Sequence, residues 1–209
     1  MTAPAKGPAY RIHTNRMVLR CWEPADAPLL KAAIDTSIEH LRPWMPWAIH
    51  EPTDISAKIA RLRLMRGNFD LGTEYVYGLF DRSEDIVLGG SGLHPRVGES
   101  AIEIGYWIHA HHINQGLATE VTGALTRVAF EVLELKRVEI HCDPQNVRSA
   151  TVPAKLGFTH EATLRQRTVD SEGKPRDTMI WTLLAEEYSK SAARSVEIEA
   201  FDVVGKRIR

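Results

Sequence analysis

Apolar residues along the chain follow two spacings, one typical of helices and one typical of strands. Spacing of three or four residues, as in Leu30, Ile34 and Ile38, predicts amphipathic helices over 26–41, 54–67, 116–135 and 147–156. Alternating or short apolar runs between turn-forming residues predict strands over 11–22, 75–81, 86–93, 101–108, 137–142, 158–169 and 177–184. A further alternating run covers 196–204.

The order of these elements indicates the fold class. Short connections between the three strands in 75–108 favour an antiparallel meander. The strand–helix–strand–helix order that follows requires a mixed sheet. We therefore expect a single α/β domain of the α+β type over 11–188, with a mostly antiparallel central sheet and flanking helices. We expect a flexible tail over 1–10 and a C-terminal extension over 189–209, whose alternating run joins this sheet, pairs with a second chain or stays loose.

Composition narrows the class of partner. The 209 residues are 44% hydrophobic and 25% charged, with a net charge of −1. This is an ordinary globular composition without a basic field, so neither nucleic acid nor a membrane is an expected partner. Cys21 and Cys142 lie far apart and form no metal-spaced pair or disulfide framework, which favours a reduced, cytoplasmic setting. We find no leader pattern and no apolar run long enough to span a bilayer.

Two polar segments at predicted helix starts are the main candidates for chemistry. Gly116 and Ala118 open the long helix directly after a strand, where unpaired backbone N–H groups and the helix dipole suit a diphosphate. Asn146 and Ser149 open the short helix about thirty residues later, and Gly157 ends it. Each feature alone is equally consistent with a loop glycine or with ordinary helix capping.

Together, these segments resemble the two cofactor motifs of the GNAT acyltransferases. Ile113-Asn-Gln-Gly116-Leu-Ala118 is similar to that family's Q/R-x-x-G-x-G/A loop, although Ile113 stands where glutamine or arginine is usual. Asn146-x-x-Ser149 through Lys-Leu-Gly-Phe158 matches the second motif. The segments 103–108 and 41–47 resemble the fourth strand and the substrate-side loop of the ribosomal-protein alanine/serine acetyltransferase (RimJ/RimL-like) branch. The resemblance covers roughly 11–188.

The resemblance implies acetyl-CoA as the acyl donor and no metal. The strands at 103–108 and 137–142 should run parallel and splay apart, with the pantetheine arm in the gap. The N–H of Ile108 should then donate to the thioester carbonyl. The resemblance assigns cofactor binding to Trp107, Ile108, Gln115, Gly116, Leu117, Ala118, Thr119, Asn146, Ser149 and Lys155.

The resemblance also suggests the catalytic residues. Glu103 occupies the position of the general base in many GNAT enzymes, and a solvated strand glutamate is the alternative. Ser149 is the candidate acid for the leaving thiolate, because Pro153 stands where many relatives have a tyrosine. Trp44, Trp47 and Tyr106 are the candidate substrate-binding residues.

Other polar groups receive a structural interpretation. Close backbone packing explains Gly89-Gly-Ser-Gly92 better than a P-loop does, because no lysine follows. Solvated loop residues explain His109, His111 and His112 better than a metal site does. His141-Cys142-Asp143 cannot form a nucleophile–base contact because neighbours on a strand point to opposite faces, so we do not expect a covalent acyl-enzyme.

The predicted reaction is acetyl transfer from acetyl-CoA to a primary amine, most plausibly the N-terminal amine of a protein or peptide. A small amine such as a polyamine, an amino acid or an aminoglycoside is the alternative acceptor. A succinyl-type donor, with Arg148 or Arg165 at the acyl end, and a non-catalytic CoA-binding module are further alternatives. The assembly is expected to be a monomer or a homodimer.

Overall fold

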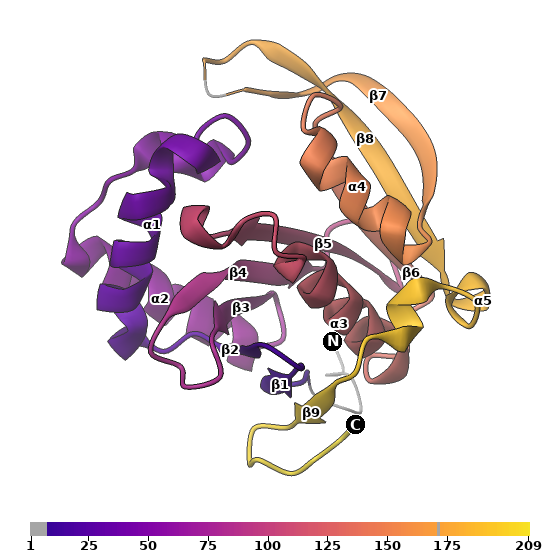
Figure 1. Ribbon diagram of the computed structural model, residues 1–209, viewed down its shortest axis with the longest axis horizontal. Helices are drawn as coiled ribbons and strands as arrows, with labels where there is room; N and C mark the ends of the chain where they lie inside the picture. Colours follow the sequence, from indigo (N-terminus) through magenta and orange to yellow (C-terminus); the bar gives the residue numbers. More distant parts are fainter. Residues whose placement is uncertain (1–7, 171) are drawn as a thin grey trace.

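The computed structural model describes residues 8–170 and 172–209. Its strands form one nine-stranded sheet in the order β7-β8-β6-β5-β4-β3-β2-β1-β9 (Figure 1). The strands are β1 Arg11–His13, β2 Val18–Cys21, β3 Tyr75–Phe80, β4 Val87–His94, β5 Ala101–Ile108, β6 Arg137–Cys142, β7 Thr159–Val169, β8 Pro175–Leu184 and β9 Glu199–Phe201. The α-helices are α1 Ala27–Leu41, α2 Ile55–Asp70, α3 Leu117–Glu131, α4 Val147–Leu156 and α5 Ala185–Tyr188. The short 3-10 helices are η1 Pro24–Asp26, η2 Pro46–His50, η3 Ala110–His112 and η4 Ala192–Ser195.

The middle of the sheet confirms the predicted fold class. β2 to β5 pair antiparallel, each with the next, and β6 pairs antiparallel with β8. β5 and β6 are parallel, and their pairing runs only from Ala101↔Arg137 to Glu103↔Glu139. No further pair joins these two strands in the described residues, so they separate beyond Glu103, as the resemblance implied.

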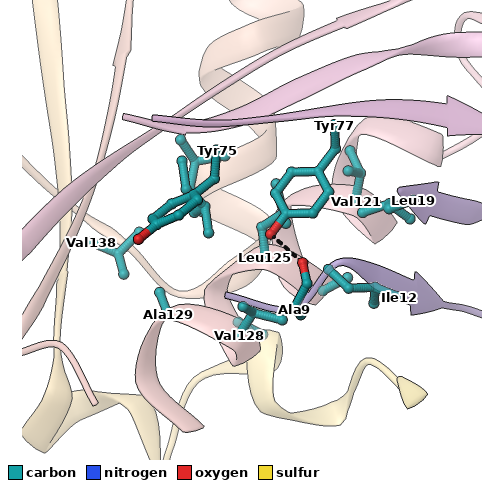
Figure 2. Close-up of a cluster of buried hydrophobic side chains, with 14 of the residues drawn as sticks. Ala9, Ile12, Leu19, Tyr75, Tyr77, Val121, Leu125, Val128, Ala129 and Val138 are labelled. Carbon is teal, nitrogen blue, oxygen red and sulfur yellow. Dashed lines mark hydrogen bonds between the residues drawn. The ribbon is translucent and has the colours of Figure 1, made fainter. Parts of the chain in front are cut away.

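Each face of the sheet has its own hydrophobic core, because neighbouring residues of a strand point to opposite faces. Leu79 of β3 belongs to the larger cluster, which α3 completes with residues such as Leu125 (Figure 2). Phe80 belongs to the smaller cluster, with side chains from α1 and α2. In the larger core, the Tyr77 hydroxyl donates to the carbonyl of Ala9 at 2.9 Å. Burial of an aliphatic side chain such as Leu79 or Leu125 stabilises the folded state by about 1.5–3 kcal/mol. The sum of many such side chains holds both helical layers against the sheet.

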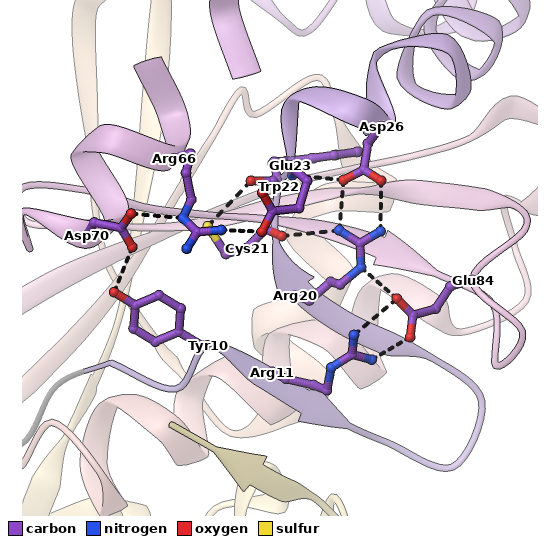
Figure 3. Close-up of polar contacts among 10 residues, drawn as sticks. All are labelled: Tyr10, Arg11, Arg20, Cys21, Trp22, Glu23, Asp26, Arg66, Asp70 and Glu84. Atoms are coloured by element: carbon purple, nitrogen blue, oxygen red, sulfur yellow. Dashed lines mark hydrogen bonds and ion pairs between the residues drawn. The ribbon is translucent and has the colours of Figure 1, made fainter. Parts of the chain in front are cut away.

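A cluster of charged side chains holds the first two strands against neighbouring turns (Figure 3). Arg20 of β2 donates to both carboxylate oxygens of Asp26, at 2.7 and 2.8 Å, and to Glu84 at 2.6 Å. Arg11 of β1 also pairs with Glu84. Glu84 lies in the turn between β3 and β4 with a φ of 62°, so these bonds fix a turn of unusual backbone conformation.

The single strand predicted over 11–22 is wrong. Thr14 donates its N–H to the carbonyl of Met17 at 2.9 Å, and its hydroxyl accepts the Met17 N–H at 3.1 Å. This turn divides the segment into β1 and β2, which pair antiparallel. A hydroxyl that bonds to nearby backbone competes with the strand ladder, which is the physical reason for the break.

Two predicted helix ends are also wrong. α2 continues through Gly67 to Asp70, where the Leu71 N–H donates to the Gly67 carbonyl at 3.0 Å. Gly67 has no positive φ, and a Cβ added to it would have no atom within 4 Å. This glycine is therefore an ordinary helical position and does not end the helix. α3 ends at Glu131 rather than near residue 135, because Glu134 takes a φ of 55° that a helix cannot continue.

Both ends of the described chain are part of the fold. Residues 1–7 of the predicted tail lie outside the described residues, while Ala9 is fully buried and the Tyr10 hydroxyl donates to Asp70 at 2.8 Å. β9 pairs antiparallel with β1, so the C-terminal extension joins this sheet (Figure 1). Among the helices described, none is long and apolar enough to cross a membrane.

Candidate functional site

A cleft of about 600 Å³ lies where β5 and β6 separate. Its walls come from the end of α1 and the loop that follows, the last residues of β5, the start of α3 and α4. Figure 1 shows α1 and α4 on opposite sides of this gap in the sheet. The predicted site residues that line the cleft are Trp44, Tyr106, Trp107, Ile108, Gly116, Leu117, Ala118, Thr119, Asn146, Ser149 and Lys155. Glu103, Gln115 and Trp47 are not among the described lining residues.

The edge of β5 presents backbone groups to the cleft. The His109 N–H donates to the carbonyl of Leu88 at 2.9 Å, on the β4 side. Because backbone groups alternate along a strand, the N–H groups of Tyr106 and Ile108 face the β6 side. Pairing with β6 has already ended at Glu103, so this edge can bind a ligand that carries amides.

The loop before α3 forms a concave group of N–H donors. Asn114 and Gly116 have φ values of 61° and 79°. The Glu120 N–H donates to the Gly116 carbonyl at 3.0 Å, so the N–H groups of the residues between them precede the helical ladder. Backbone with left-handed residues at a helix start binds anions, and this geometry fits a diphosphate.

Arg16 stabilises this loop from outside the cleft, a contact that the sequence did not indicate. It donates to the Gln115 carbonyl at 2.7 Å and to the carboxylate of Glu120 at 2.6 Å. The backbone carbonyl of Gln115 thus accepts a hydrogen bond from Arg16. The Gln115 side chain donates to the His111 carbonyl at 3.4 Å. Arg16 is 99 residues from Gln115 in the chain, and no local motif links them.

α4 brings Ser149 to the aromatic side chain of β5. The Asn146 side chain accepts the Ser149 N–H at 3.1 Å and caps the helix, and Gly157 ends it with a φ of 86°. The Tyr106 hydroxyl donates to the Ser149 carbonyl at 3.1 Å and lies 3.2 Å from the Ser149 hydroxyl. Burial raises the pKa of Tyr106, so its hydroxyl stays protonated.

Glu103 has a different environment from the one expected of an accessible base. Arg96 donates to both of its carboxylate oxygens at 2.7 Å, and His141 lies 3.6 Å away. The side chain of Glu103 is 8% exposed. Burial alone would raise the pKa of this carboxyl, but the bonds from Arg96 and the charge of His141 outweigh it and lower the pKa.

The aromatic residues of the substrate-side loop divide into two roles. Trp44 lines the cleft. The rings of Trp47 and Trp107 pack edge to face, with their centroids 6.2 Å apart. A Cβ on Gly90 of β4 would lie 2.5 Å from the indole nitrogen of Trp107. The glycine run at 89–92 thus gives Trp107 the room to lie against the sheet, which confirms the prediction of close packing.

The remaining candidates have structural partners. The His109 ring accepts the His111 N–H at 3.1 Å, and no group of three possible metal ligands occurs in the described residues. His141 bonds to Glu139 at 2.7 Å, on the face opposite to buried Cys142. Burial raises the pKa of Cys142 to about 11, which leaves the thiol protonated. Arg148 lines the cleft, whereas Arg165 is not among its described lining residues.

A helix start whose N–H groups fit a diphosphate, beside a splayed parallel strand pair, is the arrangement expected of an acyl-CoA-dependent transferase. The family model of the acetyltransferase (GNAT) domain matches residues 16–159. The chain belongs to this family, and the predicted enzyme class, an acetyltransferase that uses acetyl-CoA, is confirmed.

Relatives with curated names and solved structures support the same assignment. The chain is 27% identical over 184 residues to the ribosomal protein uS5-alanine N-acetyltransferase of Escherichia coli, which covers 87% of this chain and 94% of the relative. A probable acetyltransferase of the GNAT family from Chromobacterium violaceum matches with a TM-score of 0.72 and 27% identity, over 90% of this chain and 93% of that one. RimJ of Mycobacterium smegmatis, solved in complex with CoA-disulfide, shares the fold with a TM-score of 0.78 at 22% identity, over 93% and 95% of the two chains.

Proposed function

We propose that this enzyme transfers the acetyl group of acetyl-CoA to the N-terminal amine of a protein or peptide, by direct attack while both substrates are bound. The observation that carries the proposal is a groove of about 700 Å³ next to the cleft. Trp44 and Gln145 line both, so the two spaces adjoin. The groove runs between the substrate-side loop and the β7–β8 hairpin and has residues of both charges. An open groove of this kind suits an extended peptide better than a small amine.

The relatives point to the same class of acceptor. The E. coli relative is named for the alanine of ribosomal protein uS5, and it matches over 87% of this chain. A protein acceptor would place its first residue in the cleft and the following residues in the groove. The loop that carries Trp44 and Met45 then contacts both parts of the acceptor.

The residues of the cleft fit the requirements of the donor. The N–H groups of Leu117, Ala118 and Thr119 would hold the diphosphate, and the free edge of β5 would pair with the pantetheine amides. When bound, acetyl-CoA supplies a thioester whose carbonyl carbon accepts the amine and whose sulfur departs as a thiolate. The N–H of Ile108 would stabilise the charge that develops on the carbonyl oxygen.

Ser149 is the proposed acid for the thiolate. Its hydroxyl lies in the cleft and is positioned by Tyr106 at 3.2 Å. A protonated, buried Cys142 gives no support to a covalent acyl-enzyme, in line with direct transfer. The general base predicted from the sequence is Glu103, whose pairing with Arg96 raises the question of which group receives the amine proton.

The proposal is tested in two steps. Calorimetric titration with acetyl-CoA, succinyl-CoA and free CoA identifies the donor, and a thiol-release assay with N-terminal peptides and small amines identifies the acceptor. Acetyl-CoA binding with peptide-dependent thiol release supports the proposal. Thiol release with polyamines, amino acids or aminoglycosides alone would mean that the acceptor is a small amine. A preference for succinyl-CoA would mean that the acyl group is not acetyl. Binding of CoA without turnover would indicate a non-catalytic module.

A further inference from the structure

His40 is the penultimate residue of α1 and lines the same cleft as Tyr106, Ile108 and Ser149. His40 belongs to α1 and Ser149 to α4, and both line the cleft. The two helices lie on opposite sides of β5 (Figure 1). An amine that enters from the groove passes the loop that follows His40. This position suits a group that acts on the acceptor rather than on the donor.

The imidazole of His40 has both nitrogens available. Within the described residues it makes no hydrogen bond, ion pair or ring contact, and it is only partly exposed. Other histidines of the protein have partners: His94 bonds to Glu74, His141 to Glu139 and His160 to Thr163. His112, the second histidine of the cleft, has its ring against His109 at 5.3 Å. A half-buried imidazole without a protein partner is free to bond to a substrate.

The backbone beneath His40 is fixed in place. The fully buried Ser37, one turn earlier in α1, accepts the N–H of Ala110 at 3.0 Å. Ala110 comes two residues after Ile108, the last residue of β5. This bond therefore ties the end of α1 to the strand whose edge faces the cleft. His40 therefore keeps a set position relative to the N–H of Ile108.

The charged and titratable groups that share the cleft with His40 are Tyr106 of β5, His112 of η3, and Arg148 and Lys155 of α4. Burial, and after it the positive charge of Arg148, lowers the pKa of His40 below its usual value. A carboxylate is not among the described lining residues. His40 is thus unprotonated at neutral pH, the state in which an imidazole can accept a proton.

We infer that His40 is the general base of the acyl transfer and takes the role that the sequence suggested for Glu103. This inference rests on the proposed function. One ring nitrogen of His40 accepts a proton from the acceptor ammonium, and the nitrogen lone pair released forms the new amide bond as the carbon–sulfur bond breaks. Ser149 gives a proton to the thiolate and regains one from the amine nitrogen, which loses its second proton as the amide forms. The imidazolium returns its proton to solvent.

The test compares three variants with the wild type: His40→Gln, Glu103→Gln, and His50→Gln as a control, since His50 is exposed and lies outside the cleft. The acceptor is the peptide with the fastest wild-type thiol release in a panel that begins with alanine, serine or threonine. We expect His40→Gln to lower kcat at least about 100-fold, the range for loss of a general base, with the Kd for acetyl-CoA changed less than 2-fold. His50→Gln should leave both constants unchanged.

The pH profile separates a base from a structural role. Wild-type kcat should fall in acid, at a pH lower than the usual histidine pKa of about 6.5, because the lowered pKa of His40 delays its protonation. This fall should persist in Glu103→Gln and disappear in His40→Gln, whose melting temperature serves as the check on folding. A His40→Gln variant that keeps the wild-type kcat and the low-pH fall overturns the inference alone. Absence of thiol release by the wild type with every acceptor overturns the proposed function as well.

Discussion

The hydroxyl groups of Tyr106 and Ser149 lie 3.2 Å apart and connect β5 to α4 across the cleft. This is a direct polar contact between two of the elements that carry predicted donor-binding residues. A partly buried hydroxyl pair of this kind sets the orientation of Ser149, which we propose as the acid. The contact therefore leads to a distinct expectation for each partner.

Ser149→Ala should lower kcat about 100-fold or more, because the thiolate would leave without a proton donor. Tyr106→Phe should lower it by no more than about 10-fold, the equivalent of one neutral hydrogen bond, because the Ser149 hydroxyl remains. Steady-state kinetics with thiol detection measures both. Equal losses in the two variants would show that Tyr106 itself supplies the proton.

Gly116→Ala should weaken the binding of acetyl-CoA by about 10-fold or more. The φ of 79° at Gly116 costs an alanine about 1–2 kcal/mol, and relaxing it would move the N–H groups at the start of α3. Calorimetry measures the Kd. Gly205→Ala is the matched control, because Gly205 also has a positive φ, 76°, with no atom within 4 Å of an added Cβ. Gly205→Ala should lose a similar amount of stability and keep the wild-type Kd for acetyl-CoA. An equal loss of affinity in both variants would contradict a role of the Gly116 loop in binding the donor.

Glu84→Gln should destabilise the protein at neutral pH by about 1–3 kcal/mol, the range for hydrogen bonds to a charged group. Bonds from Arg11 and Arg20 hold the pKa of this carboxyl below its usual value. A lowered folded-state pKa means that the stabilisation is present above the unfolded-state pKa and is lost as the pH falls through the folded-state value. Urea unfolding of both proteins at pH 7 and near pH 3 should show a difference that shrinks in acid. A difference in unfolding free energy that is the same at both pH values would mean that the packing of the Glu84 side chain, and not its charge, stabilises the protein.

Lys58→Met should destabilise the protein by about 3–5 kcal/mol, because the buried carboxylate of Glu51 loses its partner. The two side chains are 1% and 6% exposed and pair between α2 and the segment after the substrate-side loop. The double variant Lys58→Met with Glu51→Gln should recover part of this loss, since no charge is then left unpaired. A double-variant cycle in urea measures the coupling, and additive losses would mean that the pair is not coupled.

Local signals allowed much of the fold to be predicted. The bounds of α4 match the prediction at 147–156, because Asn146 caps the helix and Gly157 ends it within the same short segment. β5 and β6 also match at 101–108 and 137–142. In contrast, the turn from Thr14 to Met17 and the continuation of α2 past Gly67 depend on hydrogen bonds and packing that outweigh the local pattern.

The parts of the site that a local motif encodes could be predicted from the sequence. Gly116 and the helix start that follows it have a recognisable motif, and the structure places them in the cleft. Arg16 and His40 reach the same region from segments about a hundred and about seventy residues earlier, without any spacing rule that connects them. Glu103 shows the opposite case, since its strand position was predicted correctly but its partner Arg96 was not.

In the described residues, β5 and β6 are joined by three residue pairs. This short junction separates a part of the sheet with six strands from a part with three. The smaller part carries the turn between β7 and β8 and the start of β8, which line one side of the proposed acceptor groove. A donor bound along the edge of β5 would bridge the two parts, and it would stiffen the joint between them by adding hydrogen bonds where the strand pairing has ended.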